Sequence, residues 1–457
     1  MHKDLQKING KVVIVGLGVT GIACARFFKQ RSIEVEVTDS RDNPPCLEQF
    51  KQEFPSSMIS LGGFDEQMLV SANAIIISPG VSLREPALMK AAMSGVRIWG
   101  EIEVFARFAN ARVIAITGSN GKSTVTTLVA KMLESSGKKV AVGGNLGTPA
   151  VALINEEAPD FYVIEVSSFQ LESTFSLSPS SAVILNISED HMDRYSSIAE
   201  YVNAKKRVIR GYGDVVVNMD DLLTRDLLYT VEPTRRIYTY TLNPPQEGGF
   251  GLRNNEGRVW ICFDEQLIMP ITDIKIPGMH NVSNVLAAMA LVYAVDIGFE
   301  SMVEAVKQFA GLDHRTQFVA QTNGVDWYND SKATNVGATL AAVNGMGDNL
   351  ILILGGEGKG ADFSQLKAEF AEKVKLVVLI GKDAATIQQC LEGAVEIKHA
   401  GTMKEAVEIA NAYAVSGDTV LLSPACASWD MFNGYAERGA EFVAQVQNVV
   451  KKSGGEA

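Results

Sequence analysis

Three short apolar runs along the chain each end in a glycine-rich turn. They cover residues Lys11–Gly18, Arg112–Gly118 and Leu350–Gly356. A run of this kind, rich in β-branched residues, is typical of a strand buried in a parallel sheet, and a helix usually follows the turn. Each run therefore predicts the opening of a separate α/β unit.

Apolar runs of similar length continue between and after these openings, and they alternate with helical stretches. Such alternation predicts doubly wound, mostly parallel sheets and an α/β fold class. Residues 233–275 differ, because short alternating runs flank polar turns there, so we expect an antiparallel portion within the middle unit. The further runs are Ala74–Ser78, Phe161–Val166, Ala182–Ile187, Asp214–Asn218, Leu376–Ile380 and Thr419–Ser423.

A chain of 457 residues is long enough for about three domains of roughly 150 residues each, and a single core rarely grows this large. Boundaries are expected near Trp99–Asn110 and Gly311–Gly324. The sequence therefore predicts a Rossmann-like N-terminal domain over residues 1–102, a central P-loop ATPase-like domain over 103–311, and a C-terminal Rossmann-like α/β domain over 312–457.

Composition and charge exclude several classes of protein. Apolar residues make up 47% and charged residues 21%, which is close to a soluble globular average. The net charge of −12 argues against a nucleic-acid or membrane-surface partner, which would require a basic field. The five cysteines include no CxxC pair, Met1–Lys7 is polar, and the apolar stretch Leu286–Val295 is too short to span a bilayer. We therefore expect a cytoplasmic protein without membrane insertion.

The first glycine turn carries a GxGxxG motif at Gly16, Gly18 and Gly21, and Asp39 ends the next apolar run. This is the dinucleotide-binding fingerprint in its expected strand–turn–helix context. It predicts a nucleotide or phosphate ligand, while the alternative is that the glycines only permit tight packing of strand and helix. NAD is a separate hypothesis, because Arg41 would suit a phosphate as well as a ribose.

The second glycine turn, Thr117–Thr124, reads TGSNGKST. The strict P-loop requires glycine where this chain has Ile116, but the strand, the GKST segment and the following helical run are all present. Backbone N–H groups of such a loop cradle phosphates, Lys122 can reach the β and γ oxygens, and the Ser123 hydroxyl can hold Mg²⁺. The segment predicts ATP or GTP binding.

Acidic and imidazole groups follow two later strands. Glu165 ends the run FYVIE, and His191 and Asp193 lie in the polar loop Ile187–Tyr195. Ligands of open α/β sheets bind at the carboxyl ends of strands, so these side chains are candidates for magnesium binding and catalysis. The alternative for Glu165 is a solvated charge at a strand end.

Several of these segments together resemble the Mur ligases, the ATP-dependent amide ligases of peptidoglycan precursor synthesis. The match is colinear over nearly the whole chain, and TGxxGKS/T is this family's form of the P-loop. The segments are TGSNGKST, EVSSFQLE, NISEDHMDRY, GxHNxxN at Gly278–Asn284, HRTQ at His314–Gln317 and NDSKATN at Asn329–Asn335. Within the family, SKATN, LGGEGKGADF and SPACASWDMF resemble the members that use D-glutamate.

The resemblance implies three substrates, one for each domain: UDP-N-acetylmuramoyl-L-alanine, ATP and D-glutamate. It also implies an acyl-phosphate mechanism. Contacts to the UDP substrate fall on Thr20, Asp39, Ser40, Arg41, Gly80 and Asn145. ATP contacts fall on Gly118, Ser119, Asn120, Gly121, Lys122, Ser123, Thr124, Asn281, Arg315 and Asp330. D-Glutamate contacts fall on Thr334, Lys359, Ser428 and Tyr435, although Lys359 could instead be a plain loop lysine.

The same resemblance implies the catalytic and metal-binding groups. The catalytic residues are Lys122, Glu165, His191, Lys205 and Lys332, and two Mg²⁺ ions are held by Ser123, Glu165, His191 and Lys205. Lys205 would carry a carbamate derived from CO₂. Lys205 is the last residue of the pattern YxxAK. Lys206 is the competing choice, and the alternative is that both are solvated helix lysines.

We expect the protein to be a monomer. The alternative functions are another ligase on this scaffold, an NAD-dependent oxidoreductase or a non-catalytic nucleotide-binding regulator.

Overall fold

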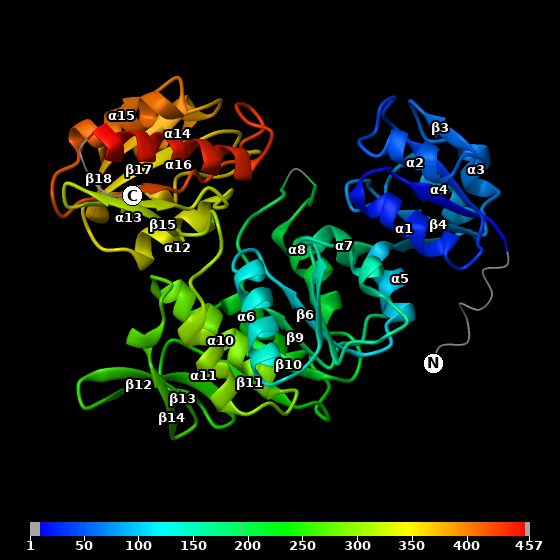
Figure 1. The fold of residues 1–457 in the computed structure, drawn as a ribbon, viewed down its shortest axis with the longest axis horizontal. Helices are drawn as coiled ribbons and strands as arrows, with labels where there is room; N and C mark the ends of the chain where they lie inside the picture. Colours follow the sequence, from blue (N-terminus) through cyan, green and yellow to red (C-terminus); the bar gives the residue numbers. More distant parts are fainter. Residues whose placement is uncertain (1–9, 193, 453–457) are drawn as a thin grey trace.

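The computed structural model describes residues 10–192 and 194–452, and it contains three β-sheets, each covered by helices. Figure 1 shows the central domain (cyan to green) between an N-terminal lobe (blue) and a C-terminal lobe (yellow to red). The α/β fold class and the three-unit organisation are confirmed. Every apolar run named above contains a strand.

The first sheet is parallel throughout and has the order β3-β2-β1-β4-β5. Buried β-branched residues such as Val12–Val15 explain why these strands lie inside, with helices on both faces. The strands are β1 (Val12–Val15), β2 (Val35–Asp39), β3 (Ile59–Leu61), β4 (Ala74–Ile77) and β5 (Arg97–Gly100). The helices are α1 (Val19–Lys29), α2 (Leu47–Glu53), α3 (Glu66–Val70), α4 (Pro86–Met93) and α5 (Glu101–Phe108).

The central sheet has nine strands in the order β14-β13-β12-β11-β10-β9-β6-β8-β7. The P-loop strand β6 lies between β8 and β9, parallel to both. The strands are β6 (Arg112–Thr117), β7 (Val140–Gly144), β8 (Phe161–Glu165), β9 (Ser181–Ile184), β10 (Asp214–Asn218), β11 (Ile237–Tyr240), β12 (Gly249–Asn255), β13 (Arg258–Phe263) and β14 (Gln266–Pro270). The loops after β6, β8 and β9 therefore meet at one edge of the sheet.

The antiparallel portion predicted for residues 233–275 was partly wrong. Only β12, β13 and β14 pair antiparallel, whereas β11 is parallel to both β10 and β12. The segment thus extends the central sheet: β11 adds a parallel strand next to β10, and the antiparallel strands β13 and β14 follow beyond β12.

Helices of several lengths cover the central sheet, and the long helix α10 is almost wholly buried. The α-helices are α6 (Lys122–Ser135), α7 (Ser168–Glu172), α8 (Ile198–Lys205), α9 (Leu222–Arg225), α10 (Met279–Tyr293) and α11 (Phe299–Gln308). The 3₁₀ turns are η2 (Ala150–Leu153), η3 (Lys206–Ile209), η4 (Asp226–Tyr229) and η5 (Ile271–Asp273). No helix among the described residues combines the length and apolarity needed to cross a membrane.

The C-terminal sheet has the order β15-β16-β20-β17-β18-β19, in which only the edge strand β15 is antiparallel to its neighbour. Its strands are β15 (Gln317–Thr322), β16 (Val325–Asn329), β17 (Leu350–Gly355), β18 (Val374–Ile380), β19 (Glu396–His399) and β20 (Thr419–Leu422). Its helices are α12 (Val336–Gly345), α13 (Leu366–Lys373), α14 (Ala384–Leu391), α15 (Met403–Tyr413) and α16 (Tyr435–Lys452).

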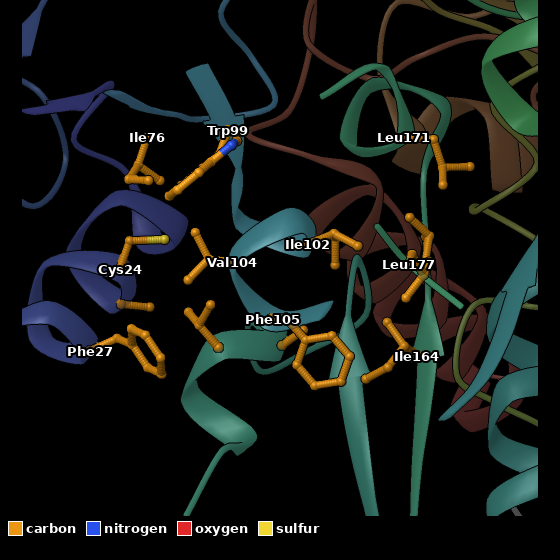
Figure 2. Packing of buried hydrophobic residues seen from close by; sticks show 14 of the residues in the cluster. Cys24, Phe27, Ile76, Trp99, Ile102, Val104, Phe105, Ile164, Leu171 and Leu177 are labelled. Carbon is orange, nitrogen blue, oxygen red and sulfur yellow. The ribbon is translucent and has the colours of Figure 1, made fainter. Parts of the chain in front are cut away.

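The N-terminal and central domains share one hydrophobic core, whereas the two core clusters of the C-terminal domain draw on that domain alone. Helix α5 lies between the two sheets, and Figure 2 shows Val104 toward Cys24 and Phe27 on one side and Phe105 toward Ile164 on the other. The Phe105 ring meets the ring of Tyr162 edge-on at 5.1 Å. The shared core fixes the first two domains relative to each other.

Helix α5 also buries two carboxyl groups in this interface. Glu101 Oε1 accepts the Val151 N–H at 2.8 Å. Burial raises the pKa of Glu101 to about 7, because hydrogen bonds from Val151, Ala150 and Gln170 only partly offset the loss of water around the carboxylate. Glu103 has a cation beside it, Arg107, whose Nε donates at 2.5 Å, and it also accepts the N–H of Phe175. The two acids thus face opposite electrostatic surroundings.

Candidate active site

The phosphate loop lies where the sequence predicted it, between β6 and α6. Gly121 caps the helix in the left-handed region, with φ of 84°, and a Cβ there would lie 2.4 Å from Asn284 Oδ1. Only glycine fits both demands. The loop therefore brings its backbone N–H groups to the start of α6, where an anion is favoured.

Polar groups that follow β9 hold this loop in place. Asn186 accepts the Asn120 N–H at 2.8 Å and donates to the Asn120 carbonyl at 3.1 Å. Ser119 exchanges two hydrogen bonds with the backbone of Ser188 and lies 3.1 Å from the Tyr201 hydroxyl. Sequence reasoning assigned no role to Asn186 or Tyr201, although their positions in the NISEDHMDRY and YxxAK segments were a usable signal.

Two lysines converge on the carbonyl of Gly118. Lys122 Nζ donates to it at 2.9 Å, and Lys205 Nζ donates to it at 2.8 Å from the end of α8. Lys205 is only 1% exposed, and burial together with the charge of Lys122 holds its pKa well below the usual range. Burial also lowers the pKa of Lys122. Lys206, the competing choice, is half-buried in the following 3₁₀ turn.

A hydroxyl from the first turn of α6 and a carboxylate from the end of β8 meet beside these lysines. Ser123 Oγ donates to Glu165 Oε2 at 2.6 Å, and Arg315 Nη2 donates to Ser123 Oγ at 2.6 Å. Asn145 Nδ2 donates to the other Glu165 oxygen at 2.6 Å. An oxygen pair of this kind suits Mg²⁺, which binds few protein oxygens and completes its shell with phosphate oxygens and water. Within residues 10–192 and 194–452, no three His, Cys, Asp or Glu side chains form a ready metal cage.

His191 lies in the loop after β9 with a left-handed backbone, φ of 59°. Its Nε2 is 3.6 Å from Asp190 Oδ2, and its ring lies 4.6 Å from the Phe169 ring. His191 thus lies in the loop after β9, whereas Ser123 lies in α6 and Glu165 ends β8. Asp193, the other candidate in this loop, lies outside the described residues.

A cavity of about 320 Å³ opens in front of the phosphate loop. Predicted ATP contacts from both domains line it: Asn120, Gly121, Thr124, Asn281, Arg315 and Asp330, with Lys332 beside them. Gly118, Ser119, Lys122 and Ser123 lie in the loop itself and are not in its lining. The cavity is therefore closed on one side by the central domain and on the other by the C-terminal domain.

Burial shifts the charges in this cavity toward neutrality. It raises the pKa of Asp330 to about 7, against hydrogen bonds from the Ser423 hydroxyl and the Thr316 N–H. Burial and the neighbouring Arg315 lower the pKa of Lys332 to about 8. The Lys332 ammonium also lies 3.6 Å from the centre of the Tyr435 ring, a cation–π contact that fixes its position.

A second, smaller cavity of about 60 Å³ lies between the loop of residues 188–192 and the C-terminal domain. Thr334 and Lys359, two of the four predicted D-glutamate contacts, line it together with His191. Ser428 and Tyr435 are not in its lining: Ser428 is buried, with its carbonyl accepting the Phe432 N–H at 2.8 Å, and Tyr435 packs on Lys332.

The third cavity, of about 520 Å³, lies at the carboxyl edge of the first sheet. Five of the six residues predicted to contact the UDP substrate line it: Thr20, Asp39, Ser40, Arg41 and Gly80. The sixth, Asn145, lies in the central domain beside Glu165.

Asp39 organises this third cavity by orienting two of its neighbours. It accepts the Leu17 N–H at 2.7 Å and both the Nε and Nη2 donors of Arg41. Burial alone would raise the pKa of Asp39, but these hydrogen bonds outweigh it and hold the pKa below its ordinary value. The pair therefore presents an ordered guanidinium to the cavity.

Comparison with known proteins agrees with this architecture. Family models match residues 10–100 (Mur ligase MurD-like, N-terminal domain), 116–292 (Mur ligase middle domain) and 314–426 (Mur ligase, glutamate ligase domain). The chain belongs to the Mur ligase family.

Two relatives show how similar this chain is to particular members. Both are named UDP-N-acetylmuramoylalanine--D-glutamate ligase. The protein from Pseudomonas syringae pv. tomato is 48% identical over 95% of this chain and 97% of its own length. That from Nitrosococcus oceani is 44% identical over 98% and 99%.

Solved structures share the fold. The UDP-N-acetylmuramate-alanine ligase MurC from Thermotoga maritima superposes with a TM-score of 0.61 at 19% identity, covering 96% of this chain and 99% of its own. A pseudomurein peptide ligase type C from Methanothermus fervidus gives 0.62 at 20% identity, covering 96% and 100%. At this level of identity, these structures support the fold alone.

Proposed function

We propose that this chain joins the alanyl carboxylate of UDP-N-acetylmuramoyl-L-alanine to the amine of D-glutamate, with conversion of ATP to ADP and phosphate. The observation that carries the proposal is the phosphate loop, with its Ser123–Glu165 oxygen pair, next to a cavity that residues of two domains line. The names of relatives 44–48% identical over nearly the whole chain give the substrates.

The three units each take one substrate. The N-terminal unit, residues 1–102, binds the UDP part in the cavity beside Asp39 and Arg41. The central unit, 103–311, binds ATP on the phosphate loop, and the C-terminal unit, 312–457, binds D-glutamate beside Thr334 and Lys359. We further propose that the protein acts as a monomer in the cytoplasm.

The chemistry has to convert an unreactive carboxylate into an acyl donor. An oxygen of that carboxylate attacks the γ-phosphorus of ATP, and ADP leaves, which produces an acyl phosphate. The amine of D-glutamate then attacks the acyl carbon, loses a proton, and phosphate departs from the tetrahedral intermediate. Both steps develop negative charge on phosphoryl oxygens, so positioned cations are the main requirement.

Lysine and arginine side chains supply those cations. Lys122 begins α6 at the end of the loop, where its ammonium donates to the carbonyls of Gly118 and Ser119, and it would turn to the phosphates when ATP binds. Arg315 and Lys332 line the cavity from the C-terminal domain. Asn281 and Asp330 also line the cavity and would contact the nucleotide. Mg²⁺, with Ser123 and Glu165 as ligands and His191 and a modified Lys205 completing two sites, would neutralise charge between the phosphates and the carboxylate.

A carbamate on Lys205 is supported by the surroundings of that amine. Addition of CO₂ requires the neutral amine, and burial beside Lys122 favours the neutral form of Lys205. The reaction forms an N–C bond, releases a proton and turns a potential cation into an anion. This anion would lie at the phosphate loop, where oxygen ligands for Mg²⁺ are needed.

The proposal is tested by measuring phosphate release with purified protein, ATP, Mg²⁺, UDP-N-acetylmuramoyl-L-alanine and one amino acid at a time. We expect release with D-glutamate, and none when the UDP substrate is omitted. Release with a different amino acid would identify another ligase on this scaffold. No release with any amino acid would refute the ligase assignment.

A further inference from the structure

The nucleotide cavity and the second cavity share a wall. Ser188 of the central domain and Gly337 of the C-terminal domain line both cavities. Asn120 of the phosphate loop lines the nucleotide cavity, and Asn335 lines the second. The side chains of these two asparagines meet within this wall.

Asn120 and Asn335 form a reciprocal amide pair across the domain boundary. Asn335 Nδ2 donates to Asn120 Oδ1 at 3.2 Å, and Asn120 Nδ2 donates to Asn335 Oδ1 at 3.4 Å. Asn335 Nδ2 also donates to Asp190 Oδ2 at 3.3 Å. Asn335 is 7% exposed, so losing these partners would leave buried polar groups unsatisfied.

The orientation of the Asn335 amide follows from its fixed partners. Its Oδ1 accepts the Ala338 N–H at 2.8 Å and so caps α12. Because a backbone N–H only donates and the Asp190 carboxylate only accepts, Oδ1 must face the helix and Nδ2 must face Asp190. The Asn120 amide then pairs with both atoms, because its Oδ1 accepts from Asn335 Nδ2 and its Nδ2 donates to Asn335 Oδ1.

Gly337 lets the two domains approach closely at this point. A Cβ on Gly337 would lie 2.8 Å from Ser188 Oγ and 3.0 Å from Ser188 Cβ. Its backbone is otherwise ordinary helix, in which alanine is favoured over glycine. The absence of a side chain therefore serves the contact between the domains and not the helix.

We propose that Asn335 is a positioning residue that holds the C-terminal domain closed over the phosphate loop and so couples nucleotide binding to amino-acid binding. Asn120 belongs to the loop that receives the phosphates, and Thr334, next to Asn335, lines the second cavity. An ordered phosphate loop presents Asn120 to Asn335, and this contact sets the position of Thr334. The inference rests on the proposed function, which places D-glutamate in the second cavity.

The two substrates should depend on this contact unequally. Both domains line the nucleotide cavity, but its phosphate loop, Thr124 and Asn281 belong to the central domain, so part of the nucleotide site does not depend on the contact between the domains. The second cavity is formed by residues 188–192 on one side and residues 334–337 and 358–362 on the other. It is complete only while the two domains stay together, so amino-acid binding should suffer first.

The test uses the full-length protein with Asn335→Ser, because serine caps helices about as well as asparagine but has no amide to reach Asn120. The matched control is Thr402→Ala, which removes the cap of α15, where Thr402 accepts the Glu405 N–H at 3.1 Å on an exposed surface of the same domain. Two quantities are measured: the KM for D-glutamate in phosphate release, and the Kd of Mg²⁺ and the ATP analogue AMP-PNP by calorimetry.

We expect Asn335→Ser to raise the KM for D-glutamate about tenfold and to keep the AMP-PNP Kd within threefold. Thr402→Ala should change neither quantity, so the two variants should differ in the KM for D-glutamate alone. A KM within threefold of wild type, or an equal loss of AMP-PNP affinity, would overturn the proposal. If Asn335→Ser does not fold, Asn335→Asp replaces it with the same thresholds, because aspartate keeps the oxygen that caps α12 but has no amide N–H for Asn120 or Asp190. Wild-type protein that shows no release with D-glutamate would instead refute the proposed function.

Discussion

Glu101 is a buried acid without a cation, and it allows a direct test of the electrostatics at the interface of the first two domains. Its carboxyl group accepts the Val151 N–H, and its pKa is raised from the ordinary 4.5 to about 7 by burial. The substitution Glu101→Gln keeps an oxygen for Val151 and removes the ionisable proton. The variant should therefore be more stable than the wild type wherever the wild-type group is forced to ionise.

The sign and size follow from the raised pKa. Between pH 4.5 and 7 the folded protein holds a proton that the unfolded chain releases, so wild-type stability from this group is full below pH 4.5 and is lost as the pH rises through 7. The difference corresponds to about 3 kcal/mol above pH 7. For the roughly 300 residues that share this core, the entropy of unfolding is about 0.6 kcal/mol per kelvin, so the melting temperature should rise by about 5 °C.

The assay is differential scanning calorimetry of both proteins from pH 4.5 to pH 8. The two melting temperatures should coincide at pH 4.5 and separate as the pH rises, with Glu101→Gln higher. Glu103→Gln is the matched control, because Glu103 lies in the same helix but has Arg107 and backbone donors as partners. It should lower the melting temperature at pH 8. Parallel curves for Glu101→Gln and wild type would refute the argument that burial penalises this charge.

Three predictions concern the reaction. Lys122→Ala should lower kcat for ATP-dependent ligation about 100- to 1,000-fold, since one charge-stabilising donor is lost, and unchanged turnover would show that the phosphate loop is not the ATP site. Lys205→Ala should be inactive and partly restored by acetate or formate, whereas Lys206→Ala should remain active; full activity of Lys205→Ala would exclude the carbamate. Arg41→Ala should raise the KM for the UDP substrate about 10- to 100-fold with kcat unchanged, and a selective effect on the KM for ATP would contradict the placement of that substrate.

Local sequence signals predicted the elements of the fold and much of the site. The strand–turn–helix context of residues 117–124 was sufficient to place Lys122 and Ser123, because a phosphate loop is built from consecutive residues. The position of Glu165 at a strand end was equally local. Lys205 was chosen through the resemblance to the Mur ligases and its pattern YxxAK, and in the structure its amine is buried at the end of α8, 2.8 Å from the Gly118 carbonyl.

Pairings between distant segments could not be predicted in this way. The order of strands in the central sheet puts β6 between β8 and β9, and this alone brings Glu165 to 2.6 Å from Ser123. The amide pair of Asn120 and Asn335 joins residues 215 positions apart, and sequence reasoning assigned Asn335 no role beyond its place in the NDSKATN segment. Strand β11 was misassigned, because it lies between β10 and β12 and is parallel to both, and a short alternating run does not show which neighbours a strand will have.

The core shared through α5 has a consequence for how this chain can be recombined. A C-terminal domain from a relative could be exchanged by matching a polar contact surface, since its own clusters close within residues 317–450. The N-terminal domain could not be exchanged in the same way. Its Cys24 and Phe27 are part of the same packing as Ile164 and Leu171 of the next domain, so a graft would have to carry the whole complementary face with it.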